Sequence, residues 1–267
     1  GYPAIQSFAI EHAFVRDACG KQGSIAALGP CPFAGIPNDS DDNAVDFIFV
    51  DNNGTSAGAG QRLGVAGPQN LISPTTGRSG IVSTSLDGCV AGNAPPNRVR
   101  DFTTNPGQNS TFGTLDIRRE YTNTTGAALT NLRFRIDDLT TFPAPDGVAD
   151  MRPRTSANVS VTVDQPPCGS NSNVTVFGTT VETPPSQPNG GGFNTTFGVA
   201  AVSAGTPLAN GATIKLRFLF GLQQTGLFRV DLMPEALPAG GGPDPNLIGC
   251  TDGATCSEFI FRDGFDP

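Results

Sequence analysis

Hydrophobic and polar residues alternate over short stretches along much of the chain. In NLRFRIDDL, Leu132, Phe134 and Ile136 fall on one side of an extended strand, and Arg133 and Arg135 fall on the other. A two-residue period is the spacing of side chains on one face of a β-strand. Such segments recur roughly every 8 to 12 residues, and no long segment has a helical period. The pattern therefore predicts an all-β fold.

The predicted strands share this alternation, or are apolar on both faces as a buried central strand is. They lie within residues 4–15, 45–51, 80–86, 97–102, 114–123, 131–139, 157–164, 173–182 and 212–237. The range 173–182 is expected to hold a pair of strands. The range 212–237 is expected to form a hairpin. Its facing residues are Ile214, Leu216, Phe218, Phe220 and Leu222 on one arm and Phe228, Val230 and Leu232 on the other.

Four arginines accompany two of these strands and are expected to point outward. They are Arg118, Arg119, Arg133 and Arg135. An anion site is one interpretation of them. Cross-strand pairing with Asp116, Glu120 or Asp137 is the alternative that we favour, because opposite charges on neighbouring strands stabilise a sheet.

Composition narrows the fold class. The chain has 34 Gly and 23 Pro residues, which suits many tight turns, and 18 Phe residues, which suit a packed core rather than disorder. We therefore expect an Ig-like, Greek-key β-sandwich with long Gly/Pro-rich loops and extended N- and C-terminal strand segments. The expected parts are an N-terminal strand and Cys-closed loop region (1–60), the sandwich (61–238), and a Pro/Gly linker with a Cys-anchored tail (239–267).

Charge and hydropathy exclude several classes of function. The net charge is −8 and only 15% of residues are charged, which opposes nucleic-acid binding because that requires a basic surface. No apolar tract is long enough to span a membrane. A signal peptide is expected to be absent or already removed. A weakly charged surface rich in Thr, Asn, Ser and Gln is typical of secreted β proteins, so we expect an extracellular or cell-surface location.

The six cysteines also favour an oxidising, extracellular location. They are Cys19, Cys31, Cys89, Cys168, Cys250 and Cys256. The number is even, no CxxC motif occurs, and a single histidine argues against zinc, so disulfides are the better interpretation. Fifteen pairings are possible. We expect the local pairs Cys19–Cys31 and Cys250–Cys256, which leaves Cys89–Cys168.

Catalytic motifs are missing from the sequence. His12 is the only histidine and lies in an apolar alternating segment, so we interpret it as a strand residue rather than a general base. GxSxG is absent, and a glycosidase cleft would need aromatic platforms that a chain with no Trp and two Tyr does not favour. We therefore expect no enzyme activity, and a hydrolase is only the third hypothesis.

Two acidic runs are candidate calcium ligands. Asp39, Asp41 and Asp42 belong to one run, and Asp146 and Asp150 to the other. Calcium prefers several carboxylate and carbonyl oxygens in loops. Neither run has EF-hand spacing, and a solvated acidic turn is the alternative that we favour. Calcium is thus the only candidate cofactor.

Several motifs between residues 62 and 238 resemble a known module. They are RREYTNTTGAALTNLRFRIDDLTTFPAP, GTTVETPPSQPNGGGFN and FLFGLQQTGLFRVDLMPEALP. The chain is similar here to bacterial secreted Ig-like β-sandwich modules of large surface proteins. This resemblance implies structural or adhesive use and brings no catalytic residues. The segment IFRDGFDP resembles the IFxDGFE ending of exported proteins from gammaproteobacteria related to Lysobacter, with Asp266 in place of Glu, which implies sorting or docking.

These observations favour a non-catalytic subunit of a surface fibre or filament that self-associates by strand exchange or by docking of a terminal segment. Residues 4–15 are the first candidate donor and residues 257–265 the second. Their apolar side chains are Ile5, Phe8, Ile10, Phe14, Phe259, Phe261 and Phe265. The open alternative for each segment is pairing within its own chain. The second hypothesis is a monomeric adhesin or carbohydrate-binding module with a glycan or cell-surface ligand, using calcium and loop residues such as Phe33, Phe142 and Phe193.

Overall fold

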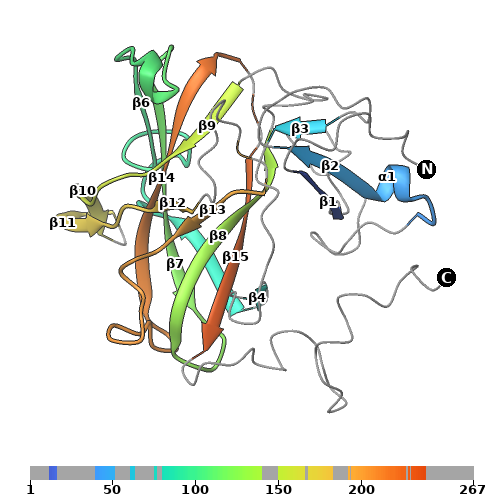
Figure 1. The fold of residues 1–267 in the computed structure, drawn as a ribbon. Coiled ribbons are helices and arrows are strands. Elements are labelled where there is room, and N and C mark those ends of the chain that lie inside the picture. The colour runs from blue at the N-terminus through green and yellow to red at the C-terminus, as the bar shows by residue number, and fades with distance from the viewer. Residues whose placement is uncertain are drawn as a thin grey trace.

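Two five-stranded antiparallel sheets pack face to face in the computed structural model (Figure 1). The structure describes residues 12–16, 40–51, 61–63, 75–76, 80–139, 150–165, 168–182, 192, 194–226, 228 and 230–238. The predicted all-β sandwich is thereby confirmed. Among the helices in these ranges, none is long and apolar enough to cross a membrane.

The first sheet has the order β12-β13-β8-β15-β4. Its strands are β12 (Thr180–Glu182), β13 (Thr196–Gly198), β8 (Leu129–Leu139), β15 (Val230–Pro238) and β4 (Thr75–Thr76). The second sheet has the order β5-β7-β14-β9, and β6 also pairs with β7. Its strands are β5 (Ile81–Ser85), β7 (Thr114–Asn123), β14 (Thr213–Gln224), β9 (Asp150–Arg154) and β6 (Arg98–Asp101).

Smaller elements complete the described fold. β1 (His12–Arg16), β2 (Phe47–Asp51) and β3 (Gln61–Leu63) form a three-stranded sheet, and β10 (Val159–Gln165) pairs with β11 (Ser170–Val176). One helical turn, α1 (Asn43–Asp46), precedes β2, and a short 3-10 helix, η2 (Pro106–Gln108), precedes β7. The predicted strand 45–51 therefore begins only at Phe47. The buried Asp46 carboxylate accepts hydrogen bonds from the backbone N–H and hydroxyl of Ser40, which stabilises the turn before the strand.

The core lies between the two large sheets. Leu132, Phe134 and Ile136 of β8 are buried, as the alternation predicts. The Phe134 ring lies 4.6 Å from that of Tyr121 on β7 and 5.1 Å from that of Phe218 on β14, centre to centre. Tilted aromatic pairs at this spacing add to the free energy gained by burying apolar area. The aromatic residues that the pattern placed on inward faces therefore join the sheets.

The predicted hairpin in residues 212–237 is wrong. β14 pairs with β7 and β9, whereas β15 pairs with β8 and β4. The chain thus passes from one sheet to the other between these strands. The two apolar faces do oppose one another, but across the core. In the same way, β11 pairs with β10 and β12 pairs with β13, so the strands in 173–182 are not partners of each other.

Candidate functional site

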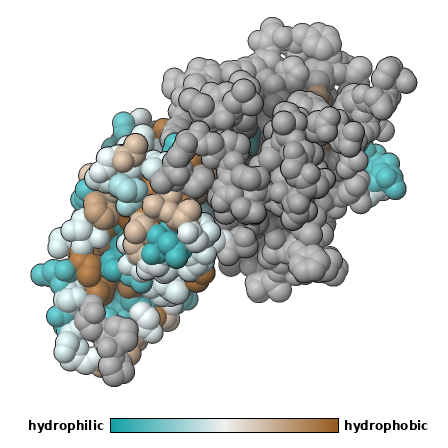
Figure 2. Space-filling model, turned by 90° about the horizontal axis from the view of Figure 1, so that it is seen from below, coloured by the Kyte–Doolittle hydropathy of each residue, from teal (hydrophilic) through white to brown (hydrophobic). Residues whose placement is uncertain are grey.

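A groove opens between the two sheets on the side where β15 faces β5, β6 and β7. Its volume is about 490 Å³, within the range of pockets that hold ligands or peptide side chains. Figure 2 shows the molecule from below. On this face of the described part, hydrophobic residues (brown) lie among residues of intermediate hydropathy (white) and hydrophilic residues (teal). The groove, which we call the inter-sheet groove, combines apolar walls with two guanidinium groups.

Beside the groove, one edge of β15 has few partners among the residues that the structure describes. β8 pairs with one edge of β15 along residues 230–238, but β4 pairs only with Glu235 and Ala236 on the other edge. Within the ranges that the structure describes, no strand pairs with the second edge of Val230–Pro234. Unpaired edges present free backbone N–H and C=O groups to any extended segment.

The apolar wall of the groove consists of side chains that the core leaves partly uncovered. Phe228, Val230 and Leu232 come from β15 and the residue shortly before it, and Ile117 comes from β7. All four are only partly buried, whereas Phe134, Phe218 and Leu216 in the middle of the sandwich are fully buried. The sandwich is therefore closed at its centre and open along this side.

Arg98 and Arg119 supply positive charge to the groove. Arg98 donates from Nε to the carbonyl of Asn93 over 3.2 Å, and its guanidinium lies 5.9 Å from the centre of the Phe228 ring. Arg119 donates from Nη1 to the carbonyls of Asn97 and Arg118. Neither guanidinium has a carboxylate within ion-pair distance in the described part of the chain. An anion bound in the groove could therefore form charge-assisted hydrogen bonds with both guanidinium groups.

The prediction that Arg119 points outward is wrong. Arg119 shares the inward face of β7 with Ile117 and Tyr121 and lines the groove. Arg118, its neighbour, faces outward and binds Asp116 at 2.9 Å. Side chains of successive residues in a strand point to opposite faces, so the two arginines cannot both face solvent.

The outer faces of the sheets carry ion pairs, though with partners other than the cross-strand pairs that we favoured. Asp116 binds Arg118 of its own strand and Arg217 of β14. Glu235 of β15 receives hydrogen bonds from both Arg133 and Arg135 of β8, each at 2.6 Å. Lys215 of β14 pairs with Glu120 at 2.5 Å. The side chain of Asp137 lies outside the described part. Glu235 follows a proline in a mostly apolar segment, so only the β8–β15 register reveals its role.

Tyr121 lines the groove and is buried. Burial raises the pKa of its hydroxyl to about 12, although hydrogen bonding to Ser83 and the charge of Arg119 both lower the pKa. The hydroxyl therefore stays protonated at neutral pH. The other described residues that line the groove include no carboxylate, imidazole or thiol. The arrangement suits binding better than general acid–base chemistry.

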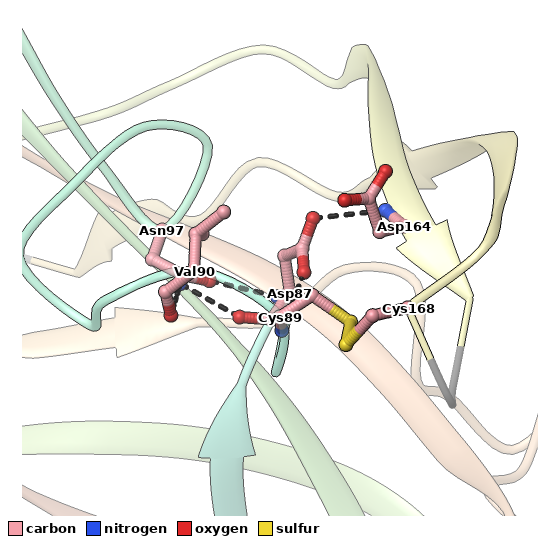
Figure 3. The surroundings of a disulfide bond; sticks show 6 residues. All are labelled: Asp87, Cys89, Val90, Asn97, Asp164 and Cys168. Carbon is pink, nitrogen blue, oxygen red and sulfur yellow. Dashed lines mark hydrogen bonds between the residues drawn. A yellow bond between two sulfur atoms is a disulfide. The ribbon is translucent and has the colours of Figure 1, made fainter.

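A disulfide holds the segment that positions both groove arginines. Cys89 and Cys168 are joined, with their Cα atoms 5.5 Å apart, and this is one of the three pairs that the spacing predicts. Figure 3 shows the surrounding hydrogen bonds. The Asp87 carboxylate accepts from the backbone N–H groups of Cys89 and Asp164, each at 2.8 Å. The buried Asn97 side chain bonds to the backbone of Asp87 in both directions.

The same cluster has the composition of a weak metal site. Possible ligand atoms of Asp87, Cys89 and Asp164 lie within 4.8 Å of one another. However, the sulfur of Cys89 is bonded to Cys168, and both Asp87 oxygens accept backbone N–H groups. We therefore interpret Asp87 as a structural link between β10 and the segment after β5 (Figure 3).

The other sequence-predicted site residues are only partly within the described ranges. Asp41 and Asp42 are exposed beside α1, and Asp150 belongs to β9. In the described ranges, Asp41 and Asp42 join no group of three metal-ligating side chains, and the side chain of Asp150 lies outside the described part. The remaining candidates lie outside the described residues: Asp39, Asp146, Cys19, Cys31, Cys250, Cys256, Ile5, Phe8, Ile10, Phe33, Phe142, Phe193, Phe259, Phe261 and Phe265.

Phe14 is the one self-assembly candidate that the structure describes. It lies in β1, opposite Phe49 of β2, and its side chain is 41% exposed. Residues 12–15 of the first candidate donor segment thus pair within their own chain. For these residues, the alternative of pairing within their own chain therefore holds.

Two exposed aromatic residues at the edge of the second sheet were missed. The side chain of Phe102 is 75% exposed and that of Phe112 is 47% exposed. Arg100 lies 4.5 Å from the centre of the Phe102 ring and donates to the carbonyls of Phe112 and Thr114. Phe102 ends a predicted strand, and the sequence alone gives no sign that it points to solvent.

Comparison with known proteins adds no relative. No family model, no curated protein and no solved structure matches this chain. The resemblance to secreted Ig-like modules therefore stays a prediction, and the function is argued from the groove.

Proposed function

We propose that this chain is a non-catalytic extracellular structural module, and that its inter-sheet groove binds an extended polypeptide segment to build a surface fibre or filament. The observation that carries the proposal is the edge of β15 over Val230–Pro234, which pairs with no strand among the described residues and lies beside a groove with apolar walls. In β-strand addition, main-chain hydrogen bonds along an edge provide affinity, and pockets for alternate side chains provide register.

The geometry of β15 suits this mode of binding. Phe228, Val230 and Leu232 line the groove at two-residue spacing, so an added strand would place every second side chain against them. Pro234 lacks a backbone N–H and would end a new ladder at that point. The available edge is therefore short, which suits an inserted segment of a few residues whose side chains fill the groove.

A segment bound in this way by another copy makes a head-to-tail contact. Such contacts do not close on themselves when the rotation between copies is arbitrary, and they then generate filaments. The polar, weakly charged composition and the cysteine content support an extracellular location for the assembly.

Electron microscopy and the mass of the purified protein in solution test the proposal. We expect filaments, or oligomers that grow with concentration. Leu232→Asp, which puts a charge into the groove, should abolish them. Val82→Asp is the matched control, because Val82 is 47% exposed on β5. A 27.5 kDa monomer at all concentrations, or assembly that survives Leu232→Asp in a folded variant, would contradict the proposal.

An adhesin or carbohydrate-binding module is the second candidate function. It is favoured by Phe102, whose exposed ring is held against the Arg100 guanidinium. Exposed aromatic rings bind the apolar faces of sugars. Glycan-array binding that is lost in Phe102→Ala and kept in Leu232→Asp would favour this function over fibre assembly.

A further inference from the structure

We infer that the occupant of the inter-sheet groove is the segment 257–267 of this protein, SEFIFRDGFDP. The inference rests on the proposed function, since it names the segment that the groove receives.

The groove sets two requirements for its occupant. Ile117, Phe228, Val230 and Leu232 are partly uncovered, so the occupant must present apolar side chains at alternate positions. Arg98 and Arg119 donate only to backbone carbonyls in the described part of the chain. A carboxylate on the same face of the occupant would form charge-assisted hydrogen bonds with them.

The segment 257–267 meets both requirements. Phe259, Phe261 and Phe265 occur at two- and four-residue spacing, and therefore share one face of an extended strand. Asp263 lies on the same face, between the last two phenylalanines. Glu258 and Asp266 add negative charge, against a single Arg262. The sequence of the segment thus has the pattern of an alternating apolar strand, with a carboxylate among its aromatic residues.

The other candidate donor fits the groove less well. Residues 4–15 carry Phe8 and Ile10 at the right spacing, but Glu11 is their only carboxylate and falls on the opposite face. His12, on the apolar face, would bring positive charge toward the arginines when protonated. In addition, residues 12–15 already pair with β2.

The connecting chain is long enough for the segment to reach the groove. β15 ends at Pro238, and even if Cys250 and Cys256 are joined, residues 239–250 span up to about 40 Å when extended. The nine residues of β15 span about 30 Å. Both the groove of the same chain and that of a neighbouring copy are therefore within reach.

Photo-crosslinking in the full chain tests the occupant. Phe261 is replaced by benzoylphenylalanine, and the products are mapped by mass spectrometry. We expect crosslinks to the peptides that contain Ile117 or Val230. The matched control places the same group at Ile260, whose side chain points to the other face, and should give at least several-fold fewer groove crosslinks. Crosslinks distributed elsewhere, or equal yields from both positions, would overturn the inference.

A charge reversal tests the carboxylate separately. Asp263→Lys in the crosslinking chain should lower the yield of groove crosslinks about ten-fold, the loss expected for a charge-assisted hydrogen bond. Asp266→Lys makes the same charge change on the opposite face and should lower the yield much less. Equal effects of the two substitutions would contradict the predicted contact with Arg98 and Arg119.

Mixing light and heavy-isotope chains separates this inference from the proposed function. Light–heavy crosslinks in the groove support both the occupant and the assembly. Groove crosslinks only within one chain support the occupant and contradict the filament. Filaments without groove crosslinks from residue 261 overturn the occupant and leave the proposed function standing.

Discussion

The guanidinium of Arg98 lies 5.9 Å from the centre of the Phe228 ring, and this contact joins β6 of one sheet to the residues that lead into β15 of the other. A cation over an aromatic face at this distance contributes about 0.5–1 kcal/mol at a partly exposed site. Both residues line the inter-sheet groove, so Phe228 forms part of the apolar wall and also contacts one of the two guanidinium groups.

Replacing Phe228 should weaken both stability and assembly. Phe228→Ala removes part of the groove wall and the cation–π contact, and because Phe228 is only partly buried, we expect a loss of about 1–2 kcal/mol in the free energy of unfolding. Urea denaturation measures this loss, and sedimentation velocity measures the assembly. Phe112→Ala is the control, because the Phe112 side chain is 47% exposed and does not line the groove, and it should cost less than Phe228→Ala. Unchanged assembly in Phe228→Ala would argue against the groove as the contact.

Alkaline pH should destabilise the fold through Tyr121. Its pKa is raised from 10.0 to about 12 in the folded chain, so the unfolded chain loses this proton first. The contribution of the protonated hydroxyl is therefore complete below pH 10 and is lost as the pH rises toward 12. The free energy of unfolding, measured from pH 8 to 11.5, should fall more steeply for the natural chain than for Tyr121→Phe. Parallel curves would show that the two states titrate alike.

Breaking the Cys89–Cys168 disulfide should cost about 4 kcal/mol, because the bond closes a loop with a sequence separation of 79. We expect this loss for the variant with serine at both positions, measured by urea denaturation. The natural chain in a reducing agent should be destabilised at least as much, because any further disulfide is reduced as well. Since the bond holds the segment that contains Asn93 and Asn97, the serine variant should also assemble less readily. A shift below about 1 kcal/mol would mean that Asp87 and Asn97 hold the segment without the bond.

Removing the charge of Glu235 should be far more damaging than removing that of Glu120. The Glu235 side chain is 7% exposed and pairs with two arginines, so Glu235→Gln should destabilise the chain by about 2–3 kcal/mol. Glu120 pairs only with Lys215, and both side chains are about a quarter exposed, so Glu120→Gln should cost about 0.5 kcal/mol. Thermal unfolding of the two variants side by side checks the difference. Equal shifts would show that burial does not strengthen the Glu235 pairs.

Much of the local structure could be predicted from the sequence. The inward faces of β7, β8 and β14 agree with the alternation, because a residue's face in a strand depends only on whether its position is odd or even. Arg119 was placed on the wrong side although the same rule applies to it. It stands at an inward position of β7, but its charge favoured solvent, and only the groove gives it a place on the inward face.

The partners of the strands could not be predicted in this way. β14 and β15 follow one another and have facing apolar residues, as a hairpin would, yet they belong to different sheets. Glu235 meets Arg133 and Arg135 across about 100 residues of chain. Alternation shows which face of a strand is buried, and it contains no information about the neighbour that supplies the backbone hydrogen bonds.

By itself, then, the sequence determined the all-β class and the positions of the long strands, because these follow from side-chain period and turn residues along the chain. It did not show β3, β4, β9 or β13, whose residues include Met151 and Phe197 of the core. Only the tertiary structure decided the sheet order and the site. The groove depends on β4 covering just two residues of β15, and on the meeting of Arg98, Arg119 and Phe228 from separate elements. Those contacts join residues that are distant in the chain, so no local pattern encodes them.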